Sequence, residues 1–384
     1  MSARVFSGLV GQEKVITALD SAIFAANSGS SGQEMTHAWL FTGPPGSGRS
    51  NAAKAFAAAL LCRDSGCGEC SDCETASIGT HPDVEIVDVS GTSIKIDEIR
   101  EVVSRSAWGA SISKWRVVVI EDCDRMTEAA ANALLKALEE PGSQTIWLLC
   151  APTLQDVIPT IRSRCRHLNL KTPSTKEISR FLQDALGVTE EEAEIAARIS
   201  QGHIGKAKGY LKDPAFKAVR GKAFEILFEV KSEGSAITAA GKLIQLATER
   251  AELRTTSRDE EEIEELKAAL QSGSRGLVSG GSKAIKDLEK EQKARFTRLV
   301  KDEIDGLLLD YATFLRDCLT TGGSYKNSDL TKEIIRISNE NRTGQISDLL
   351  FKLNEIRSLL ATNASHILLL ETFFLSFAPL NSGN

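Results

Sequence analysis

The stretch that most constrains this chain of 384 residues is a glycine-rich segment, Gly43-Pro44-Pro45-Gly46-Ser47-Gly48-Arg49-Ser50. An apolar run at 38–42 precedes it and predicts a buried strand, and an alanine-rich run at 51–61 follows it and predicts a helix. Strand, glycine loop and helix in this order are typical of a phosphate-binding P-loop, whose backbone N–H groups converge on a phosphate at a helix N-terminus. A glycine turn without any ligand is the alternative.

One position departs from the P-loop pattern, which calls for lysine where this chain has Arg49. Lysine is a compact point charge that reaches between phosphates, whereas arginine is larger, planar and forked. Ser50 keeps the hydroxyl that would meet Mg²⁺. The sequence therefore predicts a site that binds ATP or ADP weakly if at all and does not hydrolyse it.

A second departure lies after the valine-rich run at 116–120, where Glu121 is followed by Asp122. An ATPase needs one carboxylate here to hold Mg²⁺ through water and a following one to orient the attacking water, usually in the order Asp then Glu. In the reversed order, the first side chain is one methylene longer and the second one methylene shorter than in an ATPase. Because a misplacement of about 1 Å can cost on the order of 100-fold in rate, the reversal argues against hydrolysis. Two solvated acids at a strand end are the alternative.

Four of the eight cysteines crowd into a C-x4-C-x2-C-x2-C pattern formed by Cys62, Cys67, Cys70 and Cys73. In a reducing compartment such crowding indicates a metal more often than disulfides. Four thiolates about 2.3 Å from zinc fill its tetrahedral shell and leave no position open for catalysis. The spacing predicts a structural zinc site, with a redox pair or four unrelated thiols as alternatives. His81, close by, is expected to hydrogen-bond a turn.

The hydrophobic pattern predicts two kinds of architecture along the chain. In the first part, short apolar runs alternate with helical patterns, which predicts a five-stranded parallel sheet with helices on both faces. After residue 170 the strands stop, and short helices are predicted before a nearly all-helical remainder. A highly charged stretch at 254–295, interrupted by serine and glycine, predicts an exposed helical hairpin or a partly disordered insertion. The predicted strands are 38–42, 84–87, 116–120, 145–150 and 166–170, and the short helices are 174–186, 189–200 and 204–211.

Composition excludes several classes of protein. Hydrophobic residues make up 42% and charged residues 26% of the chain, which is ordinary for a globular protein. The net charge of −6 argues against a free-standing nucleic-acid binder, because phosphate contacts need a basic surface. The chain has no signal-peptide pattern at its start and no apolar run of about eighteen residues, so we expect a cytoplasmic protein that does not span a membrane.

Arg164 stands in the segment Ile161-Arg162-Ser163-Arg164-Cys165, just before the predicted fifth strand. An arginine on a rigid loop can point out of its own subunit and meet the γ-phosphate bound by a neighbouring subunit. The alternative is a surface arginine that pairs with a local acid, and the spacing alone favours that alternative.

Taken together, these residues resemble the AAA+ clamp-loader subunits of bacterial DNA polymerase III, especially those of delta-prime type. The resemblance covers about 10–211 and implies an AAA+ domain with a zinc module at 1–171, a helical lid at 172–212 and an all-α collar at 213–384. It implies a five-membered ring with delta and gamma/tau-type partners, which uses ATP to load a sliding clamp on primed DNA. It also casts Arg164 as an arginine finger acting on a neighbour. The matching stretches are 10–12, 37–41, the P-loop, the four cysteines, 132–141 and 163–165.

The resemblance also separates delta-prime subunits from the ATP-hydrolysing subunits of the same family. The latter carry lysine in place of Arg49, the usual acid order, and a sensor arginine where this chain has Gly205. Three departures in one site imply a non-hydrolysing stator, a component of the polymerase holoenzyme that is not catalytic alone. Two alternatives remain open: an ATP-hydrolysing motor subunit of the same assembly, and an unrelated zinc-containing P-loop AAA+ protein of DNA repair or helicase loading.

Overall fold

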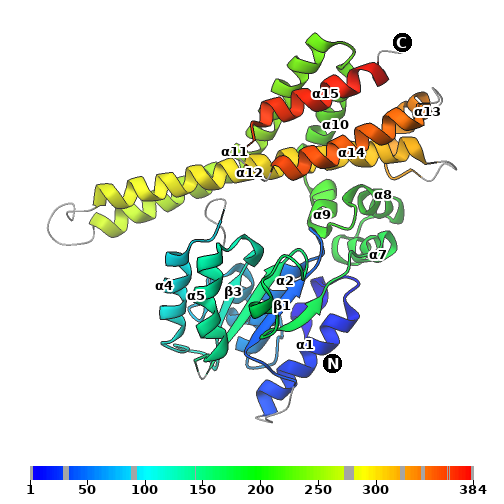
Figure 1. Cartoon of the computed structure of the whole chain (residues 1–384). Coiled ribbons are helices and arrows are strands. Elements are labelled where there is room, and N and C mark those ends of the chain that lie inside the picture. Colours follow the sequence, from blue (N-terminus) through cyan, green and yellow to red (C-terminus); the bar gives the residue numbers. More distant parts are fainter. Residues whose placement is uncertain are drawn as a thin grey trace. The chain divides into compact units, whose positions relative to one another are not determined.

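The computed structural model describes residues 3–28, 34–87, 93–142, 144–271, 281–320, 325–338, 342–360, 362 and 364–381. The chain divides into two compact units, Met1–Lys208 and Gly209–Asn384. The first unit contains a sheet with helices, and every regular element described in the second unit is a helix (Figure 1).

The sheet of the first unit has five parallel strands in the order β2-β3-β4-β1-β5, which confirms the predicted sheet. Strand β4 is one residue longer than predicted, and β5 is one residue shorter. Because every strand runs the same way, their carboxyl ends gather at one edge of the sheet and their amino ends at the other. The strands are β1 (Ala38–Thr42), β2 (Val84–Val87), β3 (Arg116–Ile120), β4 (Thr145–Ala151) and β5 (Arg166–Asn169).

Both faces of the sheet are covered by helices, which explains the valine-rich runs without polar alternation. Helices α1 (Glu13–Ser28) and α2 (Arg49–Leu61) share one core cluster with Val117 and Val119 of β3. Helices α4 (Ile96–Ser106) and α5 (Glu128–Glu139) pack on the other face with the alternate β3 residues, Val118 and Ile120. Thr127 accepts a hydrogen bond from the N–H of Ala130, as expected of a helix N-cap.

Four short elements described in the first unit were not predicted from the sequence. They are too short to show a hydrophobic period, and turns or caps define them. They are η1 (Arg4–Gly8), α3 (Ser71–Ile78), η2 (Cys123–Arg125) and α6 (Pro159–Arg162).

Three helices follow the sheet, and two of them begin with capping boxes. Ser174 and Glu177 exchange hydrogen bonds at the start of α7, and Thr189 and Glu192 do so at the start of α8. Ser174 is therefore the N-cap of α7, at the start of the predicted helix 174–186. The helices are α7 (Thr175–Leu186), α8 (Glu190–Ser200) and α9 (Ile204–Lys212).

The second unit is built around a cluster of aromatic side chains. Tyr311 is fully buried, stacks on Phe373 and donates its hydroxyl hydrogen to the carbonyl oxygen of Ala223. Helices α11 and α12 have 39 residues each and extend past this core as a hairpin (Figure 1). The helices are α10 (Pro214–Glu229), α11 (Glu233–Gln271), α12 (Gly281–Leu319), α13 (Thr331–Ser338), α14 (Thr343–Leu360) and α15 (His366–Asn381), with η3 (Ser328–Leu330) before α13.

The hairpin agrees with one of the two expectations for the charged stretch at 254–295. Arg295 of α12 forms ion pairs with Asp259 and Glu262 of α11, and these ion pairs connect the two helices within the charged stretch. Of the predicted serine and glycine interruptions, 272–274 and 279–280 lie outside the described residues, whereas Gly281 and Ser282 open α12. Among the described helices, none is both long and apolar enough to cross a membrane.

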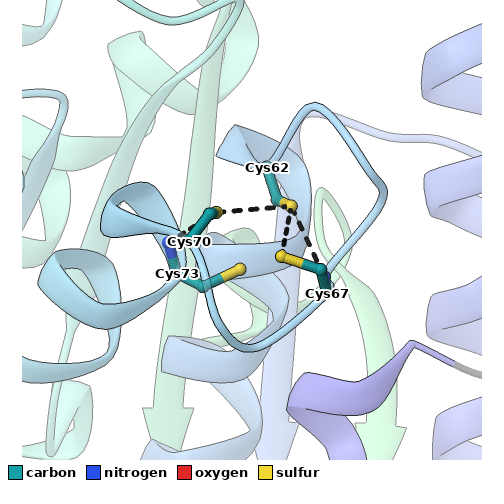
Figure 2. A group of neighbouring side chains, drawn as sticks. All are labelled: Cys62, Cys67, Cys70 and Cys73. Atoms are coloured by element: carbon teal, nitrogen blue, oxygen red, sulfur yellow. Dashed lines mark hydrogen bonds between the residues drawn. The ribbon is translucent and has the colours of Figure 1, made fainter.

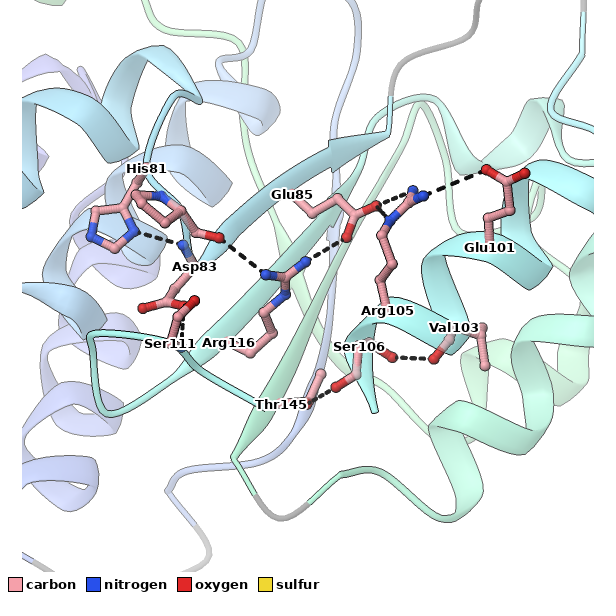
Figure 3. A network of polar contacts seen from close by, with 11 residues as sticks. His81, Asp83, Glu85, Glu101, Val103, Arg105, Ser106, Ser111, Arg116 and Thr145 are labelled. Atoms are coloured by element: carbon pink, nitrogen blue, oxygen red, sulfur yellow. Dashed lines mark hydrogen bonds and ion pairs between the residues drawn. The ribbon is translucent and has the colours of Figure 1, made fainter. Parts of the chain in front are cut away.

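A buried carboxylate fixes the loop that leads into β3 (Figure 3). Asp83 is fully buried and accepts hydrogen bonds from the Ser111 hydroxyl (2.7 Å) and the N–H groups of Ser111, Ile112 (3.0 Å) and Ser113 (2.8 Å). The N–H of Asp83 donates to Nδ1 of His81 at 3.0 Å, which confirms the expected turn role of His81. Burial alone would raise the pKa of Asp83, but the donors from Ser111, Ile112 and Ser113 outweigh it and hold the pKa well below its usual range.

We predict that Asp83→Asn lowers the free energy of unfolding by about 2–4 kcal/mol, because an amide cannot accept from all these donors. The folded-state pKa lies below the unfolded value of about 3.9, so the carboxylate stabilises the fold above that pH and loses its effect as the pH falls further. The difference in urea unfolding between wild type and variant should therefore be full at pH 7 and shrink below about pH 4. Asp97→Asn, at an exposed acid of α4, is the matched control, and equal unfolding of all three proteins at pH 7 would contradict the prediction.

Candidate nucleotide site, metal centre and rim arginine

The glycine-rich segment forms the tight loop that the sequence predicts, between the end of β1 and the start of α2. A Cβ atom at Gly43 would lie 2.4 Å from the Ser47 hydroxyl oxygen, so only glycine fits there. Gly46 and Gly48 have φ angles of +84° and +90°, a region that favours glycine. The loop lies at the carboxyl edge of the sheet, and Ser50 stands in the first turn of α2.

Arg49 turns its guanidinium onto the protein itself. Its Nη1 donates to the carbonyl oxygen of Gly43 at 2.6 Å, and its Nη2 lies 3.2 Å from a carboxylate oxygen of Asp122. These contacts tie the start of the loop to the end of β3. Arg49, which stands where a P-loop has lysine, thus directs its guanidinium to oxygen atoms of the protein.

The neighbouring acid is paired as well. Nζ of Lys54, one turn along α2, lies 2.9 Å from a carboxylate oxygen of Glu121. Asp122 adopts a left-handed backbone conformation with φ of 48°, at the turn that leads into η2. Burial, helped by the charge of Asp122, raises the pKa of the next acid, Asp124. The structure therefore brings Glu121 and Asp122 to the loop, as the sequence predicts, and places a lysine and an arginine beside them.

His203 is a contact of the loop that the sequence analysis missed. A Cβ atom at Gly46 would lie 2.8 Å from two atoms of the His203 side chain, which therefore packs directly on the loop. Gly205 faces the same ring, because a Cβ atom there would lie 3.1 Å from Cε1 of His203. Burial, together with the charge of Lys206, lowers the pKa of His203. The only signal in the sequence was a histidine two residues before the singled-out Gly205.

An open hollow of about 470 Å³ adjoins the loop on the β5 side. Its walls include Pro44 and Pro45 of the loop, together with Pro152 and Leu154 after β4. On its lining, Nε2 of His167 lies 2.6 Å from the hydroxyl oxygen of Thr42, which donates to Asn169 at 3.2 Å. The two prolines of the glycine-rich segment are thus wall residues of this hollow.

The four predicted cysteines converge at one point (Figure 2). Their sulfur atoms lie within 4.8 Å of one another, and Sγ of Cys62 is 3.6 Å from Cys67 and 3.7 Å from Cys70. Sulfurs at the corners of a tetrahedron with bonds of about 2.3 Å to zinc are about 3.8 Å apart, so the cluster fits such an ion. A disulfide needs about 2.05 Å, and the cysteines are free thiols. The cluster is therefore able to hold a metal ion.

Backbone N–H groups point at the sulfurs, as is usual around thiolate ligands. The N–H of Cys67 donates to Cys62, that of Gly68 to Cys73, and that of Cys73 to Cys70, each at 3.4 Å. Donors from Glu69 and Cys70 lower the pKa of Cys67 to about 7, whereas burial raises the pKa of Cys73. Gly66 and Gly68 have positive φ angles, which glycine adopts readily and which let the chain turn tightly between the cysteines.

Arg164 lies at the amino edge of the sheet, between α6 and the start of β5. Its Nη2 forms an ion pair with Glu139, the last residue of α5, and its Nη1 donates to the carbonyl oxygen of Thr160 at 2.8 Å. The pairing with a local acid that the sequence left open is thus present. The side chain is still 35% exposed, and it lies at the edge of the sheet opposite to its own P-loop.

A parallel sheet whose first strand runs into a P-loop makes the first unit an α/β module of P-loop type. Residues 11–174 match the family described as DNA polymerase III, delta subunit. The chain is 36% identical over 163 residues to the delta' subunit of DNA polymerase III from Pseudomonas aeruginosa, covering 41% of this chain and 50% of that protein. It is 31% identical over 215 residues to the tau subunit from Bacillus subtilis, covering 54% and 37%.

These matches agree with the resemblance stated above, because residues 11–174 are similar to subunits of DNA polymerase III. The chain spans about half the length of the curated relatives it matches, or less. A DNA polymerase III gamma subunit-related protein from Thermotoga maritima has a similar structure over 95% of this chain and 99% of its own, with 17% identity and a TM-score of 0.48.

Proposed function

We propose that this chain is a delta-prime-type, non-hydrolysing subunit of a DNA polymerase III clamp loader. It would join delta and gamma/tau-type subunits in a five-membered cytoplasmic ring and take part in ATP-driven loading of the sliding clamp on primed DNA. The similarity to the delta' subunit of Pseudomonas aeruginosa supports this proposal, and so does the family match.

The observation that carries the non-hydrolysing role is the pairing of charges inside the P-loop site. A nucleotide with Mg²⁺ would have to displace Arg49 from Asp122 and from the Gly43 carbonyl, and would compete with Lys54 for Glu121. Each charge-assisted hydrogen bond that is lost costs roughly 1.5–3 kcal/mol where it is shielded from water. We therefore propose a degenerate nucleotide site formed by Gly43 to Ser50 with Glu121 and Asp122.

The polarity of the sheet supports the proposal that Arg164 is an arginine finger in trans. Its guanidinium lies at the amino edge, whereas its own P-loop follows the carboxyl end of β1. A partly exposed guanidinium on the opposite edge of the sheet from the P-loop of its own chain could bind a phosphate held by a neighbouring subunit.

We further propose a structural zinc ion held by Cys62, Cys67, Cys70 and Cys73, which would have no open coordination position. We retain the proposed domain limits, namely the AAA+ domain at 1–171, the lid at 172–212 and the collar at 213–384. Helices α7 to α9 would form the lid, and the helical region with the aromatic cluster would form the collar.

A motor subunit of the same assembly is the second candidate, because the match to the tau subunit of Bacillus subtilis covers more of this chain than the delta' match does. The pairing of Arg49 argues against it.

The first test is nucleotide binding and hydrolysis by the isolated chain. We expect no magnesium-dependent ATPase activity above background, measured as released phosphate. Arg49→Lys should tighten ATP binding by about tenfold in a titration with fluorescent ATP, because lysine cannot contact Gly43 and Asp122 at the same time, as arginine does, and should still not restore hydrolysis. Arg180→Lys, at an exposed position of α7, is the control. Unaided cleavage at the rate of a gamma/tau-type subunit would establish the motor alternative instead.

The second test concerns Arg164 in the complex reconstituted with the delta and gamma/tau-type subunits of the same organism. Arg164→Ala should lower the rate of ATP hydrolysis at the single interface it serves by about 10³-fold. The total DNA-stimulated ATPase activity of the complex should fall by the fraction that this interface contributes. A rapid-quench measurement of phosphate released in the first turnover would show that one ATP site of the complex no longer hydrolyses its nucleotide. Arg198→Ala, which removes an exposed arginine of α8, should leave the activity unchanged. Full activity of the Arg164 variant would refute the finger role.

The third test concerns the metal. We expect one zinc ion per chain by elemental analysis, and its loss in Cys67→Ser, because a three-sulfur site binds zinc less tightly. Cys165→Ser, outside the cluster, should retain the metal. A wild-type protein that contains no zinc after purification without chelators would show the assignment to be wrong.

A further inference from the structure

We infer that Glu139 is a positioning residue for Arg164, which it holds at the surface in the orientation that meets a neighbouring subunit's phosphate. This inference rests on the finger role proposed for Arg164. It concerns a residue at the end of α5, 25 positions earlier in the chain, that only the folded structure brings to the finger.

Three contacts orient the guanidinium. Glu139 pairs with Nη2, while the Thr160 carbonyl oxygen and the Ser163 hydroxyl oxygen accept from Nη1 at 2.8 and 3.3 Å. An arginine has five N–H donors in a rigid plane, so three contacts on it leave donors for an incoming phosphate oxygen. Thr160 and Ser163 are local in sequence, and Glu139 provides the contact from another element.

The backbone under both charged residues is fixed by buried neighbours. Leu138 is 1% exposed, and its carbonyl oxygen lies 2.8 Å from Nε2 of His37, so the last turn of α5 is anchored to the segment that enters β1. On the other side, Ile161 is fully buried, and its carbonyl oxygen accepts from the N–H of Arg164 at 3.1 Å. The ion pair therefore joins two fixed points, and the direction of the guanidinium is set before any phosphate arrives.

Preorganisation is the physical reason for the expected effect. A free arginine side chain has many rotamers, and ordering it at the moment of reaction would subtract from its stabilisation of the transition state. The pair is about half exposed at Glu139, and ion pairs of this kind add little to the stability of a fold. Glu139 should therefore matter for the finger more than for folding.

The experiment uses Glu139→Gln in the reconstituted complex with primed DNA and the sliding clamp. We expect kcat for the interface served by Arg164 to fall about 3- to 10-fold with an unchanged KM for ATP, because glutamine keeps the size of the side chain and removes its charge. Glu139→Asp should recover part of the loss. Glu140→Gln, the adjacent exposed acid, is the matched control and should have no effect, and Tm of all these variants should equal that of the wild type.

A double-mutant cycle separates positioning from a general structural role. In the Arg164→Ala background, Glu139→Gln should cause no further loss, whereas a structural defect would lower activity equally in both backgrounds. If Arg164→Ala lowers activity but Glu139→Gln leaves it unchanged, the inference about Glu139 alone is overturned. A rise in activity would also overturn it, because it would mean that the carboxylate repels the incoming phosphate. If Arg164→Ala itself has no effect, the finger role and this inference fall together.

Discussion

The parallel sheet of the first unit is the constraint on which the candidate sites depend. Because the five strands run in one direction, the loops after their carboxyl ends meet at one edge, and the residues before their amino ends meet at the other. The P-loop and the two acids after β3 therefore share the first edge, while Arg164 and the end of α5 share the second. The sheet thus separates the proposed nucleotide site from the arginine that we propose acts on a neighbouring subunit.

At the carboxyl edge, the loop has the shape of a P-loop while the charged side chains beside it pair with one another. The glycines still turn the backbone, and α2 still starts at the loop. The charged side chains at the loop form ion pairs with each other: Arg49 pairs with Asp122, and Lys54 pairs with Glu121. Low-dielectric surroundings favour such pairing, because an unpaired buried charge is costly. The charged side chains at the loop therefore have partners within the protein itself.

The sequence predicted those features whose cause is local. Apolar runs predicted all five strands within one residue, and close cysteine spacing predicted the metal-type cluster. The short helices α3 and α6 were missed because a single turn or two shows no hydrophobic period. The contacts of His203 with Gly46 and of Glu139 with Arg164 were missed for another reason. They join segments far apart in the chain, and no spacing rule predicts which distant side chain fills a given place.

Helix α2 links two features that have so far been treated apart. The glycine loop lies at its first turn, and Cys62 follows its last residue, so thirteen residues, about 20 Å, separate the two ends. The alanine side chains of this helix are buried against the sheet along nearly its whole length, which leaves no flexible joint in between. The helix is in effect a stiff rod. A shift of Cys62 along the helix axis would therefore also shift the first turn of α2, where the glycine loop ends.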